Sequence, residues 1–309
     1  MPETLQLHHP RLVAVWPGMG QVALNAGVYL LAKLDMNIIA EFEASNLFDV
    51  DFVEVKEGII QTGRRPRNRL YLWTDPQKKH DLVVFLGEAQ PPVGKYAFCR
   101  QLIDHAVQLG VERVFTFAAM ATQMHPEHPA RVFGAATDRE SLEELKRLEL
   151  QVLEDGQIGG LNGVLLGAAA EKGLPGACLL GEMPHIFSQL PFPKASLAIL
   201  EVFTTVTRIE LDLTELGEQA RTTEQKLGEL LAQVEKAYGL QPTEEKEEYI
   251  PEPTEQERLT PDDKQRIEGL FEKARNDRSK AFELKQELDR LAVFKDYEDR
   301  FLDLFKKPG

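Results

Sequence analysis

Short apolar runs alternate with helical runs over the first two thirds of the chain. Leu12–Trp16 and Leu82–Leu86 are continuous apolar stretches, which are typical of strands buried on both faces of a parallel sheet. The sequence predicts helices over Gln21–Lys33, Tyr96–Leu109 and Gly159–Lys172. We expect further strands at Ile38–Ala44, Phe52–Ile60, Leu70–Thr74, Val114–Phe117 and Ala177–Leu180.

Turn and cap signals mark several boundaries. Gly110 and Gly173 stand where two of these helices should end, and Glu57-Gly58 is a turn signal within the stretch 52–60. Thr137 and Glu140 have the spacing of a capping box at the head of a helix through Leu148. The piece from Leu148 to Val152 is compatible with strand or helix. Strands that alternate with helices predict a three-layer α/β/α sandwich with a mainly parallel sheet over residues 1–212.

The pattern changes after Thr207. A capping box at Asp212 and Glu215 opens a helix whose apolar residues keep a three-four spacing, which gives a first C-terminal helix at 213–240. Residues 241–259 form an acidic linker, with seven Glu and one Lys at 243–257 between prolines. Residues 260–309 then form a second helical segment, in which we expect a second long helix that begins at Thr260-Pro261 and keeps its three-four spacing through Leu291. Its narrow apolar stripe, interrupted at Asp277, resembles a coiled-coil seam.

Composition and charge narrow the function class. The 309 residues carry 36 Lys and Arg against 50 Asp and Glu, a net charge of −14, which argues against binding nucleic-acid phosphates or an anionic membrane. The N-terminus has no apolar signal region, and Ile158–Ala170 is too short to span a membrane. Cys99 and Cys178 lie in apolar stretches and suit buried, reduced thiols. We therefore expect a cytoplasmic protein.

Two glycine turns are candidates for ligand binding. Gly18-x-Gly20-x-x-Ala23 follows a strand and opens a helix, where it would hold a pyrophosphate or form a tight packing turn. Gly159 and Gly160 open the next buried helix, where a small anion or close helix packing explains them. Glu88 and Gln90 follow the apolar strand 82–86, at the edge where α/β sheets bind ligands, so a ligand contact or a hydrated loop is expected there.

Other motifs carry less chemistry. Prolines around His125 and His128 prevent the helical geometry of a metal pair, so we predict no metal site. Neither cysteine has a nucleophile signature, and no catalytic constellation or cofactor is predicted. The one basic run, at residues 64–69, would meet an acidic surface on a second copy or a partner, or form a solvated loop.

Five motifs in order resemble the PAC2 family, named for proteasome assembly chaperone 2. They are Trp16-Pro17-Gly18-Met19-Gly20, Gly87-Glu88-Ala89-Gln90-Pro91, Phe133-Gly134-Ala135-Ala136-Thr137, Gly156-x-Ile158-Gly159-Gly160-x-x-Gly163 and Pro191-x-Pro193-x-Ala195. The resemblance covers about residues 10–215 and implies an α/β/α fold similar to nucleoside phosphorylases and peptidyl-tRNA hydrolase-like enzymes. It also implies homo-oligomers or heterodimers, and non-catalytic chaperones among the eukaryotic members.

Two function hypotheses follow. The first is a non-enzymatic, homo-oligomeric assembly or scaffold protein that acts by protein contacts, with neither nucleic acid nor membrane as a partner. The alternative is an enzyme or sensor for a nucleoside-like or nucleotide-like molecule at the carboxyl ends of the strands. Some family members dock on proteasomes through a C-terminal hydrophobic-Tyr-any tail, whereas this chain ends Phe305-Lys306-Lys307-Pro308-Gly309. The resemblance therefore does not extend to docking by that route.

Overall fold

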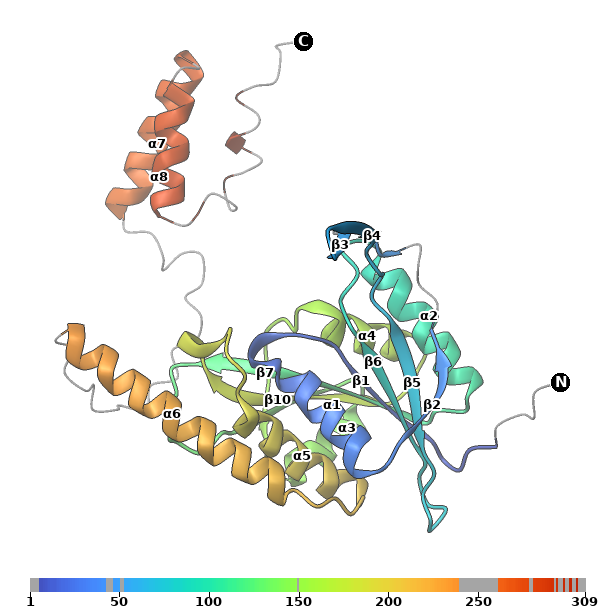
Figure 1. The fold of residues 1–309 in the computed structure, drawn as a ribbon. Coiled ribbons are helices and arrows are strands. Elements are labelled where there is room, and N and C mark those ends of the chain that lie inside the picture. Colours follow the sequence, from blue (N-terminus) through green and yellow to red (C-terminus); the bar gives the residue numbers. More distant parts are fainter. Residues whose placement is uncertain are drawn as a thin grey trace. The chain divides into compact units, whose positions relative to one another are not determined.

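The computed structural model describes residues 6–42, 47–50, 53–148, 150–238, 261–277, 280–291, 293, 297, 300–301 and 304. The chain divides into two compact units, which we call the body (Met1–Gln241) and the C-terminal unit (Pro242–Gly309). Figure 1 shows the fold of each. The predicted acidic linker, residues 241–259, lies outside the described residues.

Within the described residues, eight strands of the body form one mixed sheet in the order β2-β5-β6-β1-β7-β10-β8-β9. Its centre is parallel, because β1 pairs in parallel with β6 and β7, and β7 pairs in parallel with β10. β5 and β8 run antiparallel to β6 and β10. The strands are β1 (Arg11–Val15), β2 (Asn37–Glu41), β5 (Asn68–Trp73), β6 (Leu82–Gly87), β7 (Arg113–Thr122), β8 (Val132–Ala136), β9 (Gln151–Val152) and β10 (Gly176–Pro184).

Helices cover both faces of the sheet. One core gathers α1, α5 and α6 against the sheet, and the other gathers α2 and α4. Along β1, Val13 and Val15 face the first core while Leu12 and Ala14 face the second, so this apolar strand is buried on both faces. The predicted three-layer α/β/α architecture is confirmed. The helices are α1 (Val22–Lys33), α2 (Lys95–Gln108), α3 (Arg139–Arg147), α4 (Gly160–Glu171), α5 (Pro193–Thr207) and α6 (Thr214–Tyr238).

The stretch 52–60, expected as a single strand, is instead part of a hairpin. β3 (Val53–Lys56) and β4 (Ile59–Thr62) pair antiparallel, and the turn between them has φ +53° at Glu57 and +80° at Gly58. Positive φ at both residues of a two-residue turn matches the right-handed twist of the strands, and Gly58 adopts it without steric cost. The apolar pair after the turn hid this reversal from the sequence pattern.

The predicted capping box at Thr137 and Glu140 is wrong by one residue. Asp138 caps α3, since its Oδ1 accepts a hydrogen bond from the Ser141 backbone N–H at 2.9 Å. The Thr137 hydroxyl instead lies within hydrogen-bond distance of three acceptors, Asp138 Oδ2 at 3.1 Å and the carbonyl oxygens of Gly176 at 3.3 Å and Leu174 at 3.4 Å. The piece left open at 148–152 contains β9, which pairs in parallel with β8.

The second helical segment folds back on itself. Residues 261–290 form two helices, α7 (Pro261–Asn276) and α8 (Ala281–Arg290), with Asp277 in the break between them. The apolar stripes of α7 and α8 pack on each other, with Ile267, Phe271 and Leu284 fully buried, so a single long helix is not formed. The helical C-terminal extension itself is confirmed. No helix of the described residues is long and apolar enough to cross a membrane.

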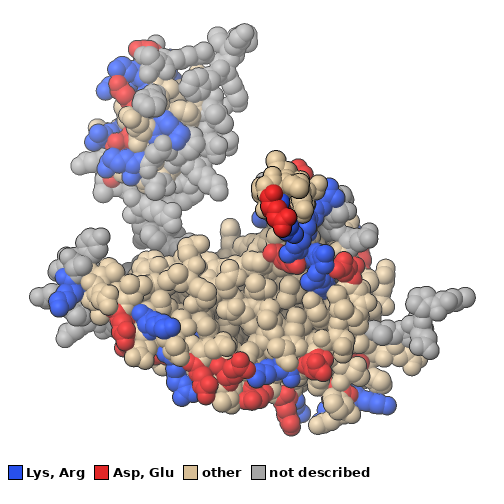
Figure 2. All heavy atoms as spheres, in the orientation of Figure 1, with Lys and Arg blue, Asp and Glu red and all other residues tan. Residues whose placement is uncertain are grey.

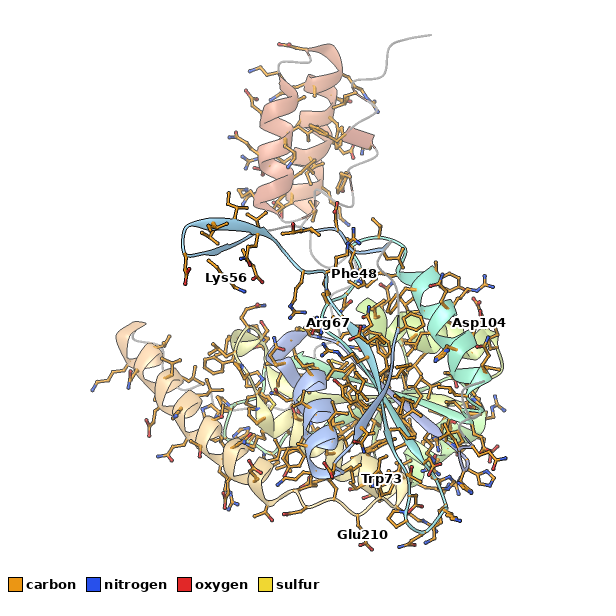
Figure 3. All side chains as sticks on the ribbon, turned by 45° about the vertical axis from the view of Figure 1, so that its right-hand side comes forward. Phe48, Lys56, Arg67, Trp73, Asp104 and Glu210 are labelled. Carbon is orange, nitrogen blue, oxygen red and sulfur yellow. The ribbon has the colours of Figure 1, made fainter. Side chains whose placement is uncertain are left out.

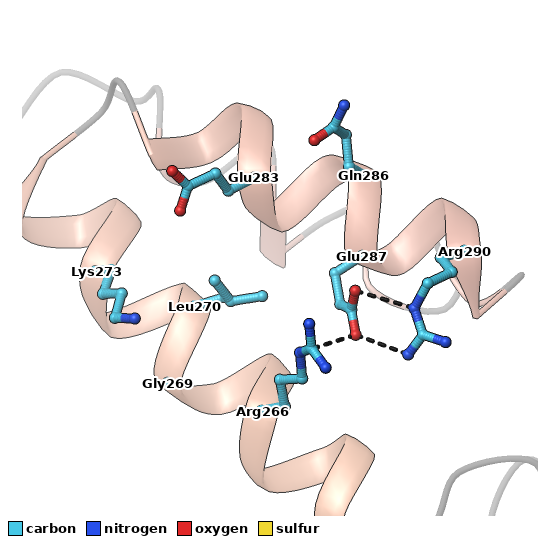
Figure 4. A pocket seen from close by; sticks show the side chains of 8 residues that line it. All are labelled: Arg266, Gly269, Leu270, Lys273, Glu283, Gln286, Glu287 and Arg290. Carbon is cyan, nitrogen blue, oxygen red and sulfur yellow. Dashed lines mark hydrogen bonds and ion pairs between the residues drawn. The ribbon is translucent and has the colours of Figure 1, made fainter.

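A hollow of about 640 Å³ opens between α7 and α8 (Figure 4). The Glu287 carboxylate inside it contacts Arg290 at 2.8 Å and Arg266 at 3.1 Å. The hydrogen bond from Arg290 outweighs burial and lowers the pKa of Glu287. The Glu287 carboxylate of this hollow is therefore already paired with Arg266 and Arg290.

Candidate functional site

Of the six predicted site residues, Gln90 joins the two glycine turns where the parallel strands end, whereas Glu88 does not. The Gln90 side chain lies between the two glycine turns, with Nε2 donating to the Pro17 carbonyl at 3.2 Å and Oε1 accepting from the Leu161 N–H at 3.1 Å. Gly160 has φ +69°, and a Cβ there would lie 2.9 Å from Gln90 Oε1. Gln90 thus joins the turn after β1 to the first turn of α4.

The turn after β1 is itself closely packed. Gly20 has φ +59°, and a Cβ there would lie 2.7 Å from the Met183 sulfur. Gly18 precedes the short 3-10 helix η1 (Met19–Gln21) in an extended conformation, and Gly159 holds the N-cap position of α4. The Gln90 amide already occupies the Leu161 donor that an anion on this helix end would use. A ligand role for Gly18, Gly20, Gln90, Gly159 and Gly160 stays a prediction.

Glu88 points elsewhere and organises the basic run. Its Oε2 accepts from Arg64 at 2.5 Å and from the Arg67 backbone N–H at 3.0 Å, and Arg69 lies 3.7 Å from Oε1. Partial burial raises the pKa of Glu88, but these hydrogen bonds and charges outweigh it, and the net pKa is lowered. Glu88 and Gln90 are therefore separated, and a ligand role for Glu88 stays a prediction.

We expect Gln90→Ala to lower the free energy of unfolding of the body by about 1–3 kcal/mol. The change leaves the partly buried Leu161 N–H donor and the partly buried Pro17 carbonyl acceptor without their partner. Both tryptophans, Trp16 and Trp73, belong to the body, so urea unfolding followed by tryptophan fluorescence measures this unit. Gln189→Ala, at an exposed position, is the matched control and should be neutral. Equal stability of the two variants would contradict a joining role for Gln90.

The cysteines and the His125–His128 pair are the other groups that the sequence offers for chemistry. Cys99 and Cys178 are free and buried as predicted, and burial raises the pKa of each thiol to about 12. The His125 and His128 rings lie 5.4 Å apart, and no group of three metal-capable side chains occurs in the described part of the chain. These thiols are thus protonated near neutral pH and poorly suited to nucleophilic attack.

Exposed aliphatic side chains gather at the same edge of the sheet, which sequence reasoning missed. Met19, Val93, Ile186 and Leu190 follow β1, β6 and β10, so they lie at the carboxyl ends of parallel strands; we call them the apolar edge. They are 42–67% exposed. In Figure 2 the middle of the body lacks charged residues, and the charged residues of the body lie along its lower border, at its left end and at the hairpin. Uncharged, exposed surface of this kind marks contact sites for other molecules.

The hairpin β3–β4 leaves the body from the same edge. β2 runs antiparallel to β5, and β5 antiparallel to β6, so β2 ends where β6 ends. In Figure 3, Phe48 and Arg67 lie at this end of the sheet, Trp73 lies at the other, and Lys56 lies out on the hairpin. The signal available in the sequence was the Glu57-Gly58 turn between β-branched residues.

Comparison with known proteins finds a matching family model and similar sequences. The family model described as "PAC2 family" matches residues 12–231. An uncharacterized protein of Methanocaldococcus jannaschii is 31% identical over 226 residues, which cover 71% of this chain and 82% of the relative.

Two solved structures are similar over the body. PbaB of Pyrococcus furiosus, described as an archaeal proteasome activator, has a TM-score of 0.62 at 26% identity, covering 76% of this chain and 96% of that one. A proteasome-assembly chaperone homologue of Mycobacterium tuberculosis has a TM-score of 0.64 at 25% identity, covering 75% and 100%. The similarity of both extends over about three quarters of the present chain.

Proposed function

The chain belongs to the PAC2 family, and we propose that it is a non-enzymatic, self-associating assembly or scaffold protein that acts through protein–protein contacts. Two similar structures carry descriptions of this kind, one a proteasome activator and one a proteasome-assembly chaperone homologue. Their partner class, a proteasome or a comparable multi-subunit assembly, is our proposal for this chain as well.

The observation that carries the proposal is the chemistry of the carboxyl-end edge. Enzymes with open α/β sheets bind their ligands in a crevice at this edge. Here Gln90 fills the space between the two glycine turns, and the outer surface presents Met19, Ile186 and Leu190 instead. Aliphatic side chains that are 42–52% exposed gain little from a small polar ligand and much from burial against another protein.

We expect the full chain to sediment and scatter light as a multiple of its 34.9 kDa mass at micromolar concentration. Light scattering over a dilution series measures this directly. A monomer at every concentration would contradict self-association.

The competing small-molecule hypothesis has its own readout. A ligand that binds only the native state must raise the melting temperature. Under the proposed function nucleosides, nucleotides and inorganic phosphate are not ligands, so a thermal-shift series with these molecules at millimolar concentration should leave the melting temperature unchanged. A clear upward shift with one of them would favour an enzyme or sensor instead.

A further inference from the structure

The hairpin β3–β4 presents one apolar face to solvent. Val55 pairs across the strands with Ile60, and Val53 pairs with Thr62, so these four side chains lie on the same face. Val53, Val55 and Ile60 are 55%, 64% and 70% exposed. None of them belongs to an apolar cluster of the described residues. The opposite face carries Glu54, Lys56, Ile59 and Gln61.

Such a hairpin needs a partner. A two-stranded hairpin in water is marginally stable by itself, and its unpaired edges and aliphatic side chains favour association. A row of β-branched side chains on a flat face packs well against an identical row, which is the geometry of an isologous two-fold contact. A second copy of the chain therefore supplies a complementary surface of the same shape and chemistry.

Charges on the hairpin select how two copies align. The tip carries Glu57, and the foot carries Arg65 and Arg67, whose side chains make no ion pair within the described residues. Two hairpins aligned in the same direction would bring foot beside foot, with arginines facing arginines. Aligned in opposite directions, each acidic tip lies beside the other copy's basic foot.

The register of the face agrees with the antiparallel alignment. The apolar rows Val53–Thr62 and Val55–Ile60 lie on either side of the level of the Glu54–Gln61 pair, whose own side chains are on the opposite face. Glu57 lies three residues from Glu54 toward the tip (57 − 54), and Arg65 lies four residues from Gln61 toward the foot (65 − 61). Stacking two faces antiparallel about the Glu54–Gln61 level brings Glu57 of one copy level with the other copy's Arg64 and one residue short of its Arg65.

We infer that two copies of this chain pair through the apolar faces of their β3–β4 hairpins, stacked antiparallel with each Glu57 beside the partner copy's Arg65. The inference deepens the proposed function, since it identifies the surface and the partner of the self-association. Two hairpins alone bury less than the roughly 1,600 Å² of a standard interface. The pair is therefore a weak dimer, with a dissociation constant of about micromolar order.

Aliphatic substitutions test the face. In sedimentation velocity with the full chain, Val55→Ser with Ile60→Ser should raise the dissociation constant at least about tenfold. Ile59→Ser is the matched control, because Ile59 is 65% exposed on the opposite face of the same turn, and it should change the constant less than about threefold. Unchanged tryptophan-detected unfolding shows that each variant keeps a folded body.

Charge reversal tests the alignment. Glu57→Arg or Arg65→Glu alone should weaken the dimer, whereas the chain with both changes should regain wild-type affinity, because each tip and foot then attract again. Failure of the double variant to regain affinity would overturn the antiparallel stack. An oligomer indifferent to all of these changes would overturn the hairpin contact while keeping self-association, and the hairpin would then be free for a different protein. A strictly monomeric wild-type chain would instead overturn the proposed function.

Discussion

Gly163→Ala is expected to lower the free energy of unfolding of the body by about 2–3 kcal/mol, the cost of forcing an extra group into a close-packed site. Gly163 lies in the first turn of α4, and the chain just before the helix folds back over it. A Cβ at position 163 would lie 1.9 Å from the Ile158 carbonyl oxygen and 2.8 Å from its carbonyl carbon. Backbone atoms cannot turn aside as a flexible side chain would, so the residues that precede α4 must move.

The helix offers its own control. Gly167 stands one turn later in α4, is exposed, and has open space where a Cβ would be. Gly167→Ala should stabilise the body by about 0.5–1 kcal/mol, because alanine has less backbone entropy to lose in a helix. Urea unfolding followed by tryptophan fluorescence compares the two variants directly. If Gly163→Ala proves as stable as Gly167→Ala, the close approach of Ile158 to α4 is wrong.

A second consequence concerns Gln90. Displacing residues 158–160 would pull the Leu161 N–H away from the Gln90 amide, to which it is now bonded at 3.1 Å. Gly163→Ala combined with Gln90→Ala should therefore cost less than the sum of the two single changes, since both disrupt the same junction. Strict additivity in the double-mutant cycle would show that the two sites are independent.

Local signals predicted most of the central fold. Continuous apolar runs identified β1 and β6 because a strand buried on both faces needs no polar alternation. Glycines with φ +76° and +67° end α2 and α4 where the sequence expects, at Gly110 and Gly173. A helix C-terminus in the left-handed conformation selects glycine directly, so the sequence carries the boundary itself.

Reversals of the chain were harder to predict. The apolar pair Ile59-Ile60 continues the β-branched pattern of β3 across its turn, so the apolar pattern alone does not separate one long strand from a hairpin, and only the Glu57-Gly58 turn signal does. The stripe from Ile267 to Leu288 has the same spacing whether one long helix faces a partner or two short helices face each other. In both cases the apolar pattern specifies burial but not which segment provides it.

In the candidate site, too, the sequence pattern does not predict which groups the side chains contact. Glu88 and Gln90 are two residues apart after one strand, and the strand pattern alone sends both to the same edge. Their partners differ: Arg64 lies 24 residues before Glu88, whereas Leu161 lies 71 residues after Gln90. Such partners arise from the order of strands in the sheet, which the sequence of apolar runs does not encode.

The second large effect concerns an ion pair at the end of β10, in which the Glu182 carboxylate is buried and the Arg131 side chain is 54% exposed. The Glu182 side chain is 1% exposed, and its oxygens accept from Arg131 Nε at 2.8 Å, Arg131 Nη2 at 2.6 Å and the Thr122 hydroxyl at 2.7 Å. These bonds join the ends of β7 and β10 to the start of β8. Burial raises the pKa of Glu182, but the Arg131 and Thr122 hydrogen bonds outweigh it and the net pKa is lowered.

We expect Arg131→Met to lower the free energy of unfolding by about 2–4 kcal/mol at pH 7, because it leaves a buried carboxylate without its cation. Adding Glu182→Leu should recover a large part of that loss, since the pair is then replaced by apolar groups. Lys146→Met, in an exposed pair with Glu143, is the control and should change stability by less than about 1 kcal/mol. A loss in the double variant as large as in Arg131→Met would contradict the account.

The pH dependence of the loss separates an unpaired charge from a mere packing defect. In the wild type the pKa of Glu182 is below its unfolded value of 4.5, so its contribution to stability is present above that value and is lost as pH falls through the folded pKa. Arg131→Met removes the side-chain hydrogen bonds and the charge of the arginine, so the folded pKa of Glu182 is higher in the variant than in the wild type, and the variant loses less stability than the wild type as pH falls. The difference in unfolding free energy between the two proteins should therefore shrink between pH 7 and pH 4. A difference that stays constant over this range would mean that the lost arginine acted through its packing and not through its charge.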